Sequence, residues 1–257
     1  MITKNTKIKF SGYEYEGYRM IWDIHTHTTY SHGKGTIEEN VNAALALGLE
    51  EIAITDHGPG HLTYGIDKAL IPEMRAEIDR LQALHPEIRI RLGVEANVTA
   101  VGNHLDIAPK EFADYDYVHA GYHYGIRNGN CMKNFINWSL PGNLWGKELL
   151  LANTEMTVAA LYENNIKILT HPGDKGPFDM HALAKACEET DTLMEISTWH
   201  SHLTEDELLI CKKYDVKFVI SSDAHVPGRV GDAAVAIKRA FKAGIDPERI
   251  VNIKKFK

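Results

Sequence analysis

The stretch "MIWDIHTHTTYSH", residues 20–32, places three histidines directly behind a short hydrophobic run. The run "MIWDI" is too short for a helix and is typical of a buried strand. His25 and His27 are two residues apart, so on an extended chain their side chains point to the same side. Two imidazoles in that position can hold one metal ion together. The chain has fourteen histidines in 257 residues, so further imidazoles in equivalent places could contribute to the same site.

Short β-branched or apolar runs recur along the chain and alternate with helical patterns. Strands are predicted at 19–24, 50–55, 88–94, 115–121, 166–171, 192–197 and 216–221, and helices at 36–47, 71–84, 179–189, 204–214 and 231–243. This alternation predicts an α/β fold of parallel strands with right-handed crossovers, either closed into a barrel or open and doubly wound. We expect a single domain over 1–257 with an N-terminal extension at 1–19. The least regular stretch, 125–151, is long for a connection and is expected to be a functional excursion.

Histidines and carboxylates follow most of the predicted strands at their C-terminal ends. They are His25, His27, His57, Glu95, His123, His171, Asp223 and His225. In a barrel or an open α/β sheet this edge carries the active site, because every strand delivers its following loop to the same face. The spacing of Asp223 and His225 repeats that of the first histidine pair. The sequence therefore predicts that these side chains converge.

Convergence of so many imidazoles and carboxylates without a cation would carry a large desolvation cost. Neutral imidazole and carboxylate without thiolate suit zinc, manganese or iron. The net charge of -7 argues against a nucleic-acid or anionic membrane partner, and no run approaches the roughly 18 apolar residues of a membrane span. Three scattered cysteines argue against a disulfide framework and favour a reducing cytoplasm.

Six segments in order, "DIHTHTTYSH", "ITDHGPGH", "GVEAN", "AGYH", "THPG" and "SSDAH", closely resemble the PHP family (polymerase and histidinol phosphatase), in particular its small stand-alone phosphatases with three metals. The resemblance runs from about residue 20 to 230. It implies a distorted seven-stranded (β/α)7 TIM-like barrel that binds two to three divalent transition metals, zinc, manganese or iron. It also implies histidinol-phosphatase-like hydrolysis of small phosphate monoesters by a metal-bridging hydroxide.

The resemblance further implies a role for each residue of the motifs. The first metal would be held by His25, His27, Glu95 and Asp223, the second by Glu95, His123 and His171, and the third by His32, His57 and His225. Glu95, Asp223 and His225 are the residues that we expect to act in catalysis.

Other residues near these motifs are candidates for substrate contacts. Lys34, His61, His202 and Arg229 lie on loops beside the expected ligands and could bind substrate, since lysine and arginine bind phosphate well. His61, His200 or His202 could protonate a leaving alkoxide. Asp23 would either orient one of the imidazoles or bind backbone. The loops 58–70, 125–151 and 198–204 are expected to recognise the leaving group.

Three other functions remain as alternatives to a phosphatase. An amidohydrolase-type metal hydrolase uses a similar HxH strand but usually carries a carboxylated lysine after a middle strand, where this chain has Glu95. A PHP-type nuclease would be expected to have a basic surface. A non-catalytic metal-binding regulator would not need the full set of ligands. A small-molecule phosphate ester is therefore the expected partner, and the particular ester and the oligomeric state are left open.

Overall fold

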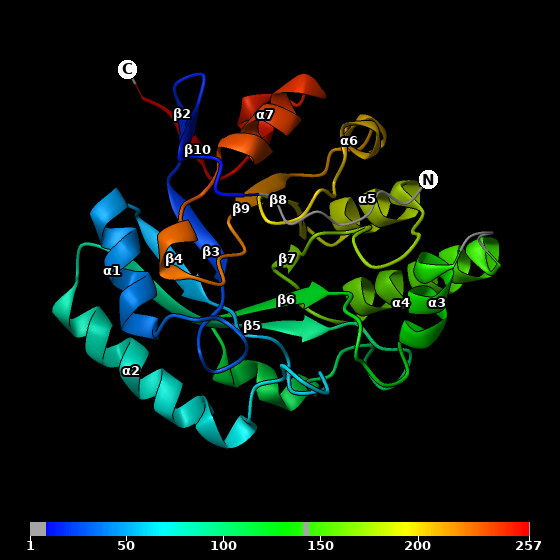
Figure 1. Cartoon of the computed structure of the whole chain (residues 1–257), viewed down its shortest axis with the longest axis horizontal. Coiled ribbons are helices and arrows are strands. Elements are labelled where there is room, and N and C mark those ends of the chain that lie inside the picture. Colours follow the sequence, from blue (N-terminus) through cyan, green and yellow to red (C-terminus); the bar gives the residue numbers. More distant parts are fainter. Residues whose placement is uncertain (1–8, 141–143, 257) are drawn as a thin grey trace.

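Seven parallel strands form the centre of the molecule and follow one another around it in chain order (Figure 1). The computed structural model describes residues 9–140 and 144–256. The strands are β3 (Trp22–Thr26), β4 (Glu51–Ile54), β5 (Arg89–Asn97), β6 (Tyr117–Gly121), β7 (Ile168–Leu169), β8 (Leu193–Ser197) and β9 (Phe218–Ser221). The predicted seven-stranded parallel arrangement is confirmed.

The sheet nearly closes into a barrel because its two edge strands meet at their C-terminal ends. Thr26, the last residue of β3, forms a parallel bridge with Ala224, just beyond β9. The backbone N–H of His27 donates to the carbonyl oxygen of Ala224 at 2.9 Å. This contact joins the first and last predicted ligand motifs, which are about 200 residues apart in sequence.

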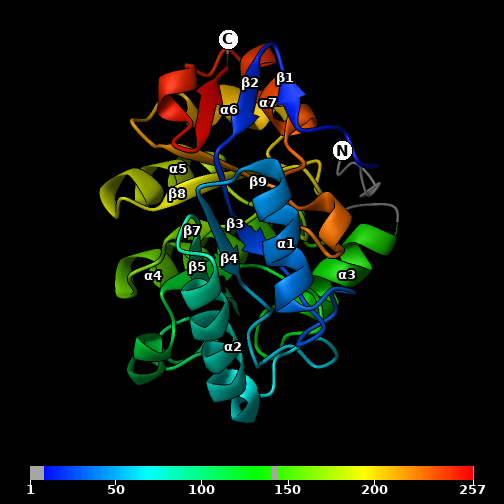
Figure 2. The same cartoon turned by 90° about the vertical axis from the view of Figure 1, so that its left-hand side faces the viewer.

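Helices surround the barrel, and Figure 2 shows α1 and α2 covering one side of it. The helices are α1 (Ile37–Leu47), α2 (Ile71–Leu84), α3 (Cys131–Ser139), α4 (Gly146–Glu163), α5 (Met180–Glu189), α6 (Glu205–Cys211) and α7 (Ala234–Lys242). Short 3₁₀ helices lie at Lys68–Leu70, Pro109–Asp114, Pro227–Arg229 and Pro247–Arg249. No helix in the described ranges combines the length and the apolar character needed to span a membrane.

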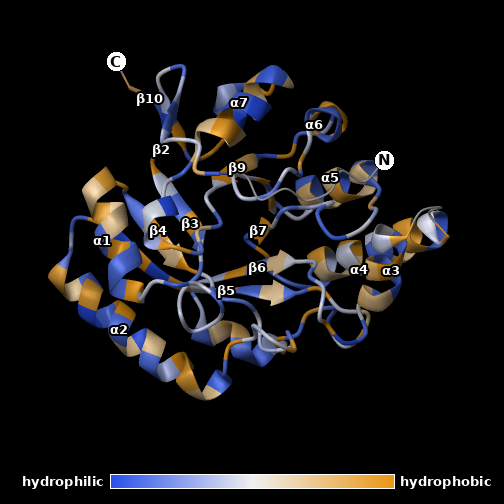
Figure 3. Cartoon of the chain, in the orientation of Figure 1, coloured by the Kyte–Doolittle hydropathy of each residue, from blue (hydrophilic) through white to orange (hydrophobic). Residues whose placement is uncertain are grey.

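Local sequence explains where these helices begin and how they pack. Thr36 and Glu39 form a reciprocal capping box at the start of α1, and Thr204 begins α6 in the same way. Along α2, hydrophobic and hydrophilic residues alternate around the helix (Figure 3). Its Met74 and Ile78 are buried four residues apart on one face.

The structure differs from the predicted elements in two places. The predicted strand at 19–24 is split: β2 (Tyr18–Met20) leaves the barrel and pairs with β1 (Glu14–Tyr15) and β10 (Ile253–Lys255). Of the predicted extension 1–19, residues 1–8 lie outside the described residues.

The second difference is the irregular stretch 125–151, which contains α3 and the start of α4, apart from the undescribed 141–143. Helix α4 has no clean apolar stripe, because polar residues such as Asn153 and Thr157 are buried among apolar ones. Asn153 satisfies its amide through a pair of 3.0 Å hydrogen bonds with Asn134 of α3. A periodicity search for apolar residues therefore misses this helix.

Candidate metal centre

The side chains expected to bind metal lie together at the C-terminal end of the barrel. His25 is on β3 and Glu95 is on β5, whereas the other seven follow strands within a few residues. Two of them, His171 and Asp223, have positive φ angles of 27° and 49°. That conformation is rare for residues other than glycine and costs free energy. The chain turns sharply at both positions and directs the two side chains inward.

Glu95 is the centre of the group, and its side chain is completely buried. Its Oε1 lies 3.0 Å from His171 Nε2 and 3.4 Å from both His123 Nε2 and His25 Nε2. Its Oε2 lies 2.9 Å from His57 Nδ1 and 3.6 Å from His27 Nε2. Each oxygen thus faces a different set of imidazoles, which is the arrangement that a carboxylate bridging two metals needs.

Asp223 closes the group on the side of β3. Its Oδ1 lies 3.1 Å from His27 Nε2 and 3.8 Å from His25 Nε2. The two imidazole nitrogens are themselves 3.1 Å apart. His25, His27, Glu95 and Asp223, which were expected to share one metal, are therefore brought into direct proximity.

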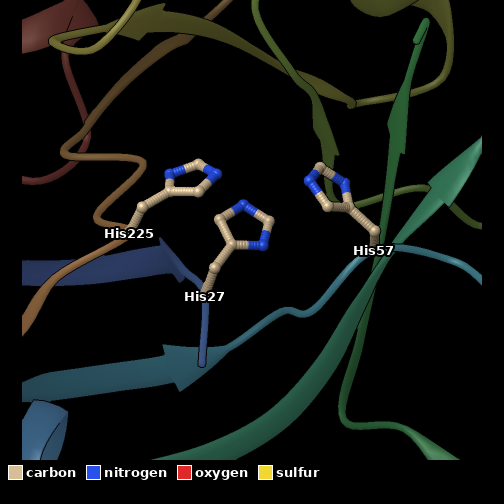
Figure 4. A group of neighbouring side chains, drawn as sticks. All are labelled: His27, His57 and His225. Carbon is tan, nitrogen blue, oxygen red and sulfur yellow. The ribbon is translucent and has the colours of Figure 1, made fainter. Parts of the chain in front are cut away.

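His27, His57 and His225 form a second cluster, and Figure 4 shows their three rings turned toward a common space. The ring centroid of His27 is 4.4 Å from that of His57 and 4.5 Å from that of His225. His32, expected to complete this cluster, lies beside it, with its ring centroid 4.7 Å from His57 and 4.2 Å from His225. Ligand nitrogens of His27, His57 and His225 lie within 4.8 Å of one another, and by ring centroid His32 is as close to His57 and His225 as His27 is.

Hydrogen bonds on the side of the imidazole rings away from the centre determine which ring nitrogen is free to bind a metal. His123 Nδ1 lies 2.8 Å from Asn97 Oδ1, and His225 Nδ1 lies 2.9 Å from the carbonyl oxygen of Asp223. Both partners accept hydrogen bonds, so each Nδ1 carries the proton and each Nε2 keeps a lone pair. Such partners orient metal-binding imidazoles. Asn97 was not identified from the sequence.

Glu195 on β8 was also missed, although it ties three other parts of the barrel together. It is completely buried, and its Oε1 lies 2.5 Å from His25 Nδ1. The same oxygen accepts a hydrogen bond from the Ser221 hydroxyl, and Oε2 accepts one from the backbone N–H of His171 at 2.5 Å. Glu195 therefore holds His25 with its Nε2 directed at Glu95 and Asp223.

Burial and mutual charge shift the pKa values of these groups strongly. Burial alone would raise the pKa of Glu95, but the His123 and His25 imidazoles hold it well below its usual range. Burial, together with His57 and His225, holds the pKa of His27 well below its usual range. Burial also lowers the pKa of His123 to about 3. The carboxylate is thus ionised and these two imidazoles are neutral at pH 7, as metal binding requires.

His25 behaves differently from its neighbours. Burial would lower the pKa of His25, but the carboxylates Glu195, Glu95 and Asp223 outweigh this effect and raise it well above its usual range. His25 Nε2 lies 3.4 Å from Glu95 Oε1 and 3.8 Å from Asp223 Oδ1, so it faces the space between these two carboxylates, where a cation would bind. Glu95 Oε2 and Asp223 Oδ1 are buried and accept no hydrogen bond of good geometry from the described part of the chain. The residues present therefore fit divalent metal ions.

The carboxylate of Asp23 binds backbone rather than an imidazole. It accepts hydrogen bonds from the backbone N–H groups of Gly231 at 2.9 Å and Ser222 at 3.3 Å. Of the two interpretations left open by the sequence, the structure supports the second. Burial raises the pKa of Asp23 to about 6.

A cavity of about 350 Å³ opens over the centre. Its wall consists of His32, His57, His61, Tyr64, His123, Tyr124, His171, Lys175, Trp199, His200, Asp223 and His225. Of the four residues expected to bind substrate, only His61 belongs to this wall. The wall also includes Tyr64, Tyr124, Lys175 and Trp199, which the sequence did not single out.

The other three predicted substrate residues are not part of this wall. Lys34 is exposed, and its backbone N–H donates to the carbonyl oxygen of His225 at 2.8 Å. His202 Nδ1 lies 3.0 Å from both carboxylate oxygens of Glu207 in α6. Arg229 is buried, pairs with Asp232 at 2.8 Å and lies 4.6 Å above the ring of Trp199. Their contact with substrate stays a prediction.

Comparison with known proteins places this centre in a family. The family model of the PHP domain matches residues 23–211. A "probable phosphatase" of Acetivibrio thermocellus is 28% identical over 228 residues, which cover 83% of each chain. "Probable phosphatase YcdX" of Escherichia coli is 25% identical over 246 residues, which cover 90% of this chain and 89% of the relative.

Solved structures of similar fold agree with this match. The structure of histidinol phosphate phosphatase from Lactococcus lactis, with zinc, L-histidinol and phosphate, covers 88% of this chain and 95% of its own at 19% identity, with a TM-score of 0.57. A candidate histidinol phosphatase from Listeria monocytogenes covers 82% of this chain and 97% of its own at 15% identity, with a TM-score of 0.65. Since the family model spans 23–211 of the 257 residues, the chain belongs to the PHP domain family.

Proposed function

We propose that this protein is a metal-dependent phosphatase that hydrolyses small-molecule phosphate monoesters. The observation that carries the proposal is Glu95, a fully buried carboxylate whose two oxygens face five imidazoles from the ends of four strands. Such a group suits a centre of two or more metals. The phosphatase names of the relatives support the choice of substrate class.

The metals would be zinc, manganese or iron, two to three per chain, since the ligands are imidazole and carboxylate without thiolate. We assign His25, His27, Glu95 and Asp223 to the first metal, Glu95, His123 and His171 to the second, and His32, His57 and His225 to the third. Two bound metals would lower the pKa of a water molecule and stabilise charge on the attacking and leaving oxygens of an in-line displacement.

The side chains of this chain orient the reactants and handle protons. Glu195 and Asn97 fix the rings of His25 and His123 from behind. Of the histidines considered as proton donors, His61 and His200 line the cavity, which supports these two as candidates for protonating the leaving oxygen.

The reaction needs no protein nucleophile. The hydroxyl groups of Ser31 and Ser221 donate hydrogen bonds to the carboxylates of Asp56 and Glu195, respectively. Neither serine, nor Ser222, belongs to the cavity wall. We therefore infer direct attack of water-derived oxygen on phosphorus, without a phosphoenzyme.

The test is a screen of the purified protein against phosphorylated metabolites. The protein is stripped of metal, reconstituted separately with zinc, manganese and iron, and assayed for release of orthophosphate. We expect at least one metal form to release orthophosphate from small monoesters. Hydrolysis of amide or other C–N substrates without any phosphatase activity would favour the amidohydrolase alternative and overturn the proposal.

A further inference from the structure

The cavity wall divides into predicted metal ligands and residues available to a leaving group. The second set comprises His61, Tyr64, Tyr124, Lys175, Trp199 and His200. Among the described residues of this wall, Asp223 is the only carboxylate, and it belongs to the metal set. Lys175 is also the only lysine or arginine among the described residues of the wall. Away from the predicted metal ligands, the described wall thus carries a lysine ammonium and no acidic side chain.

Lys175 is held in place from behind by a buried carboxylate. Its ammonium forms an ion pair with Asp174 Oδ2, and its side chain remains 21% exposed. Asp174 is itself buried and is not part of the cavity wall. A lysine ammonium has three N–H donors, so contact with Asp174 leaves donors for a ligand. The arrangement fixes a flexible side chain at the wall, where it can bind an anion at low entropic cost.

The same cluster could be mistaken for a further metal site. His171, Asp174 and His200 offer ligand atoms within 4.8 Å of one another. However, the Asp174 oxygen that lies 3.2 Å from His200 Nδ1 is the one that binds Lys175. The lysine ammonium therefore already binds the carboxylate oxygen that a further metal ion would need.

The position of Lys175 also limits the size of the leaving group. His200 lies between Asp174 and Asp223, with Nδ1 3.2 Å from the first and Nε2 3.1 Å from the second. Only one imidazole ring thus separates the lysine–aspartate pair from a predicted metal ligand. An anionic group that reaches Lys175 must lie only a few bonds from the phosphorus atom held at the metals.

We propose that Lys175 determines specificity by binding a carboxylate or second phosphate on a short leaving group, and that the cavity disfavours leaving groups that carry an ammonium. This inference rests on the proposed phosphatase function. The proposed leaving group is negatively charged. An amino alcohol such as L-histidinol, the ligand of the Lactococcus lactis structure, carries a positively charged ammonium instead. An ammonium in this part of the cavity would meet Lys175 and no unassigned carboxylate.

The experiment compares kcat/KM for small phosphate esters that differ in charge. 3-Phosphoglycerate carries a carboxylate, 1,3-propanediol bisphosphate a second phosphate, glycerol 3-phosphate no further charge, and phosphoethanolamine and histidinol phosphate an ammonium. p-Nitrophenyl phosphate measures phosphatase activity independently of this choice. We expect the wild-type protein to hydrolyse at least one of the two anionic esters about tenfold more efficiently than the ammonium esters, the scale of one charge-assisted hydrogen bond.

Substitutions of Lys175 separate its charge from its bulk. Lys175→Met should lower kcat/KM for the preferred anionic ester about tenfold and leave that for glycerol 3-phosphate nearly unchanged, whereas Lys175→Arg should retain the preference. Lys175→Glu should shift the preference toward phosphoethanolamine. The matched control is Lys217→Met, which removes an exposed lysine paired with Asp191 at 3.3 Å, outside the loops expected to recognise the leaving group, and should change nothing. Circular dichroism confirms that each variant is folded.

The two possible failures can be told apart. Two results would overturn the role of Lys175 while leaving the phosphatase function intact. One is a wild-type preference for ammonium esters. The other is a decrease of kcat/KM in Lys175→Met that is equal for all esters. The wild-type preference is measured even if a variant does not fold. Absence of orthophosphate release from every ester, including p-nitrophenyl phosphate, would overturn the proposed function and this inference with it.

Discussion

Replacing Glu195 by glutamine should weaken metal binding although every predicted metal ligand keeps its own side chain. Glu195 contacts His25 Nδ1 and the backbone N–H of His171, one through each carboxylate oxygen, at 2.5 Å. Glutamine keeps one acceptor oxygen and replaces the other by an NH₂ group, which can only donate. One of the two contacts is therefore lost, and His25 also loses a negatively charged partner that makes its Nε2 more basic.

The size of the effect follows from the position of Glu195 behind the ligands. Loss of a partner that orients a metal-binding histidine typically lowers metal affinity about 10- to 100-fold, or about 1.4–2.8 kcal/mol. A buried donor left without an acceptor adds about 1–3 kcal/mol of destabilisation. His25 loses its charged partner in either orientation of the new amide, so we expect the first site to weaken; the second site weakens as well where the NH₂ group faces the backbone N–H of His171.

The assay is competition between metal-free protein and a chromogenic chelator for zinc or manganese, with a thermal melt to confirm folding. The matched control is Glu51→Gln. Glu51 is also buried on a barrel strand, but it pairs with Arg89 and Tyr117, each at 2.6 Å, at the opposite end of the barrel. We predict lower metal affinity in Glu195→Gln alone. Equal affinities in the wild type and a folded Glu195→Gln would refute this role of Glu195.

Other predictions address metal content, protonation, ligand hierarchy and stereochemistry. Elemental analysis of undialysed protein should find two to three transition metal ions per chain, and less than one would count heavily against the site. Metal affinity should fall as pH falls, by about tenfold per pH unit for each proton displaced. The reason is that the pKa of His25 is raised, so a metal ion must replace a bound proton. Calorimetry in buffers of different ionisation enthalpy counts the protons released. Glu95→Ala should lower kcat on the order of 100-fold or more. The decrease should exceed that in His57→Ala, because Glu95 faces both groups of imidazoles. An equal or larger decrease of kcat in a folded His57→Ala would show that the third metal site matters as much as the first two. Hydrolysis of an isotopically chiral phosphate ester should invert configuration at phosphorus, whereas retention would indicate a phosphoenzyme.

The barrel and the convergence of ligands could be predicted because both depend on local sequence. Each strand is a short apolar run, and the polar residue that follows it, such as Glu95 or Asp223, marks the end of the strand directly. Parallel strands all deliver these residues to one edge. Agreement between periodicity and strand-end chemistry thus predicted the arrangement before any contact was known.

Residues that act through long-range contacts could not be predicted in this way. Glu195 stands in the run "TLMEIS" as a single acid in an otherwise apolar strand, which signals a buried charge but not its partners. Those partners, His25, His171 and Ser221, come from other strands and meet Glu195 only when the barrel forms. A charged residue inside a buried strand near predicted ligands is the signal that could have identified it.

Closeness in sequence to a predicted ligand did not indicate which side chains form the cavity wall. Lys34 is near His32 in the chain but is exposed outside the cavity, whereas Lys175, four residues after His171, lies on its wall. Side-chain direction on a loop depends on its tertiary contacts, here the ion pair of Lys175 with Asp174. Sequence spacing does not contain that information.

The most direct test of metal-dependent phosphate ester hydrolysis is a metal titration of activity. Protein stripped of metal is titrated with manganese or zinc while orthophosphate release from p-nitrophenyl phosphate and 3-phosphoglycerate is measured. We predict no release without metal, and a rate that rises with added metal and saturates between two and three equivalents per chain. A full rate in the presence of excess chelator, or no orthophosphate release from either ester at any metal concentration, would contradict the account.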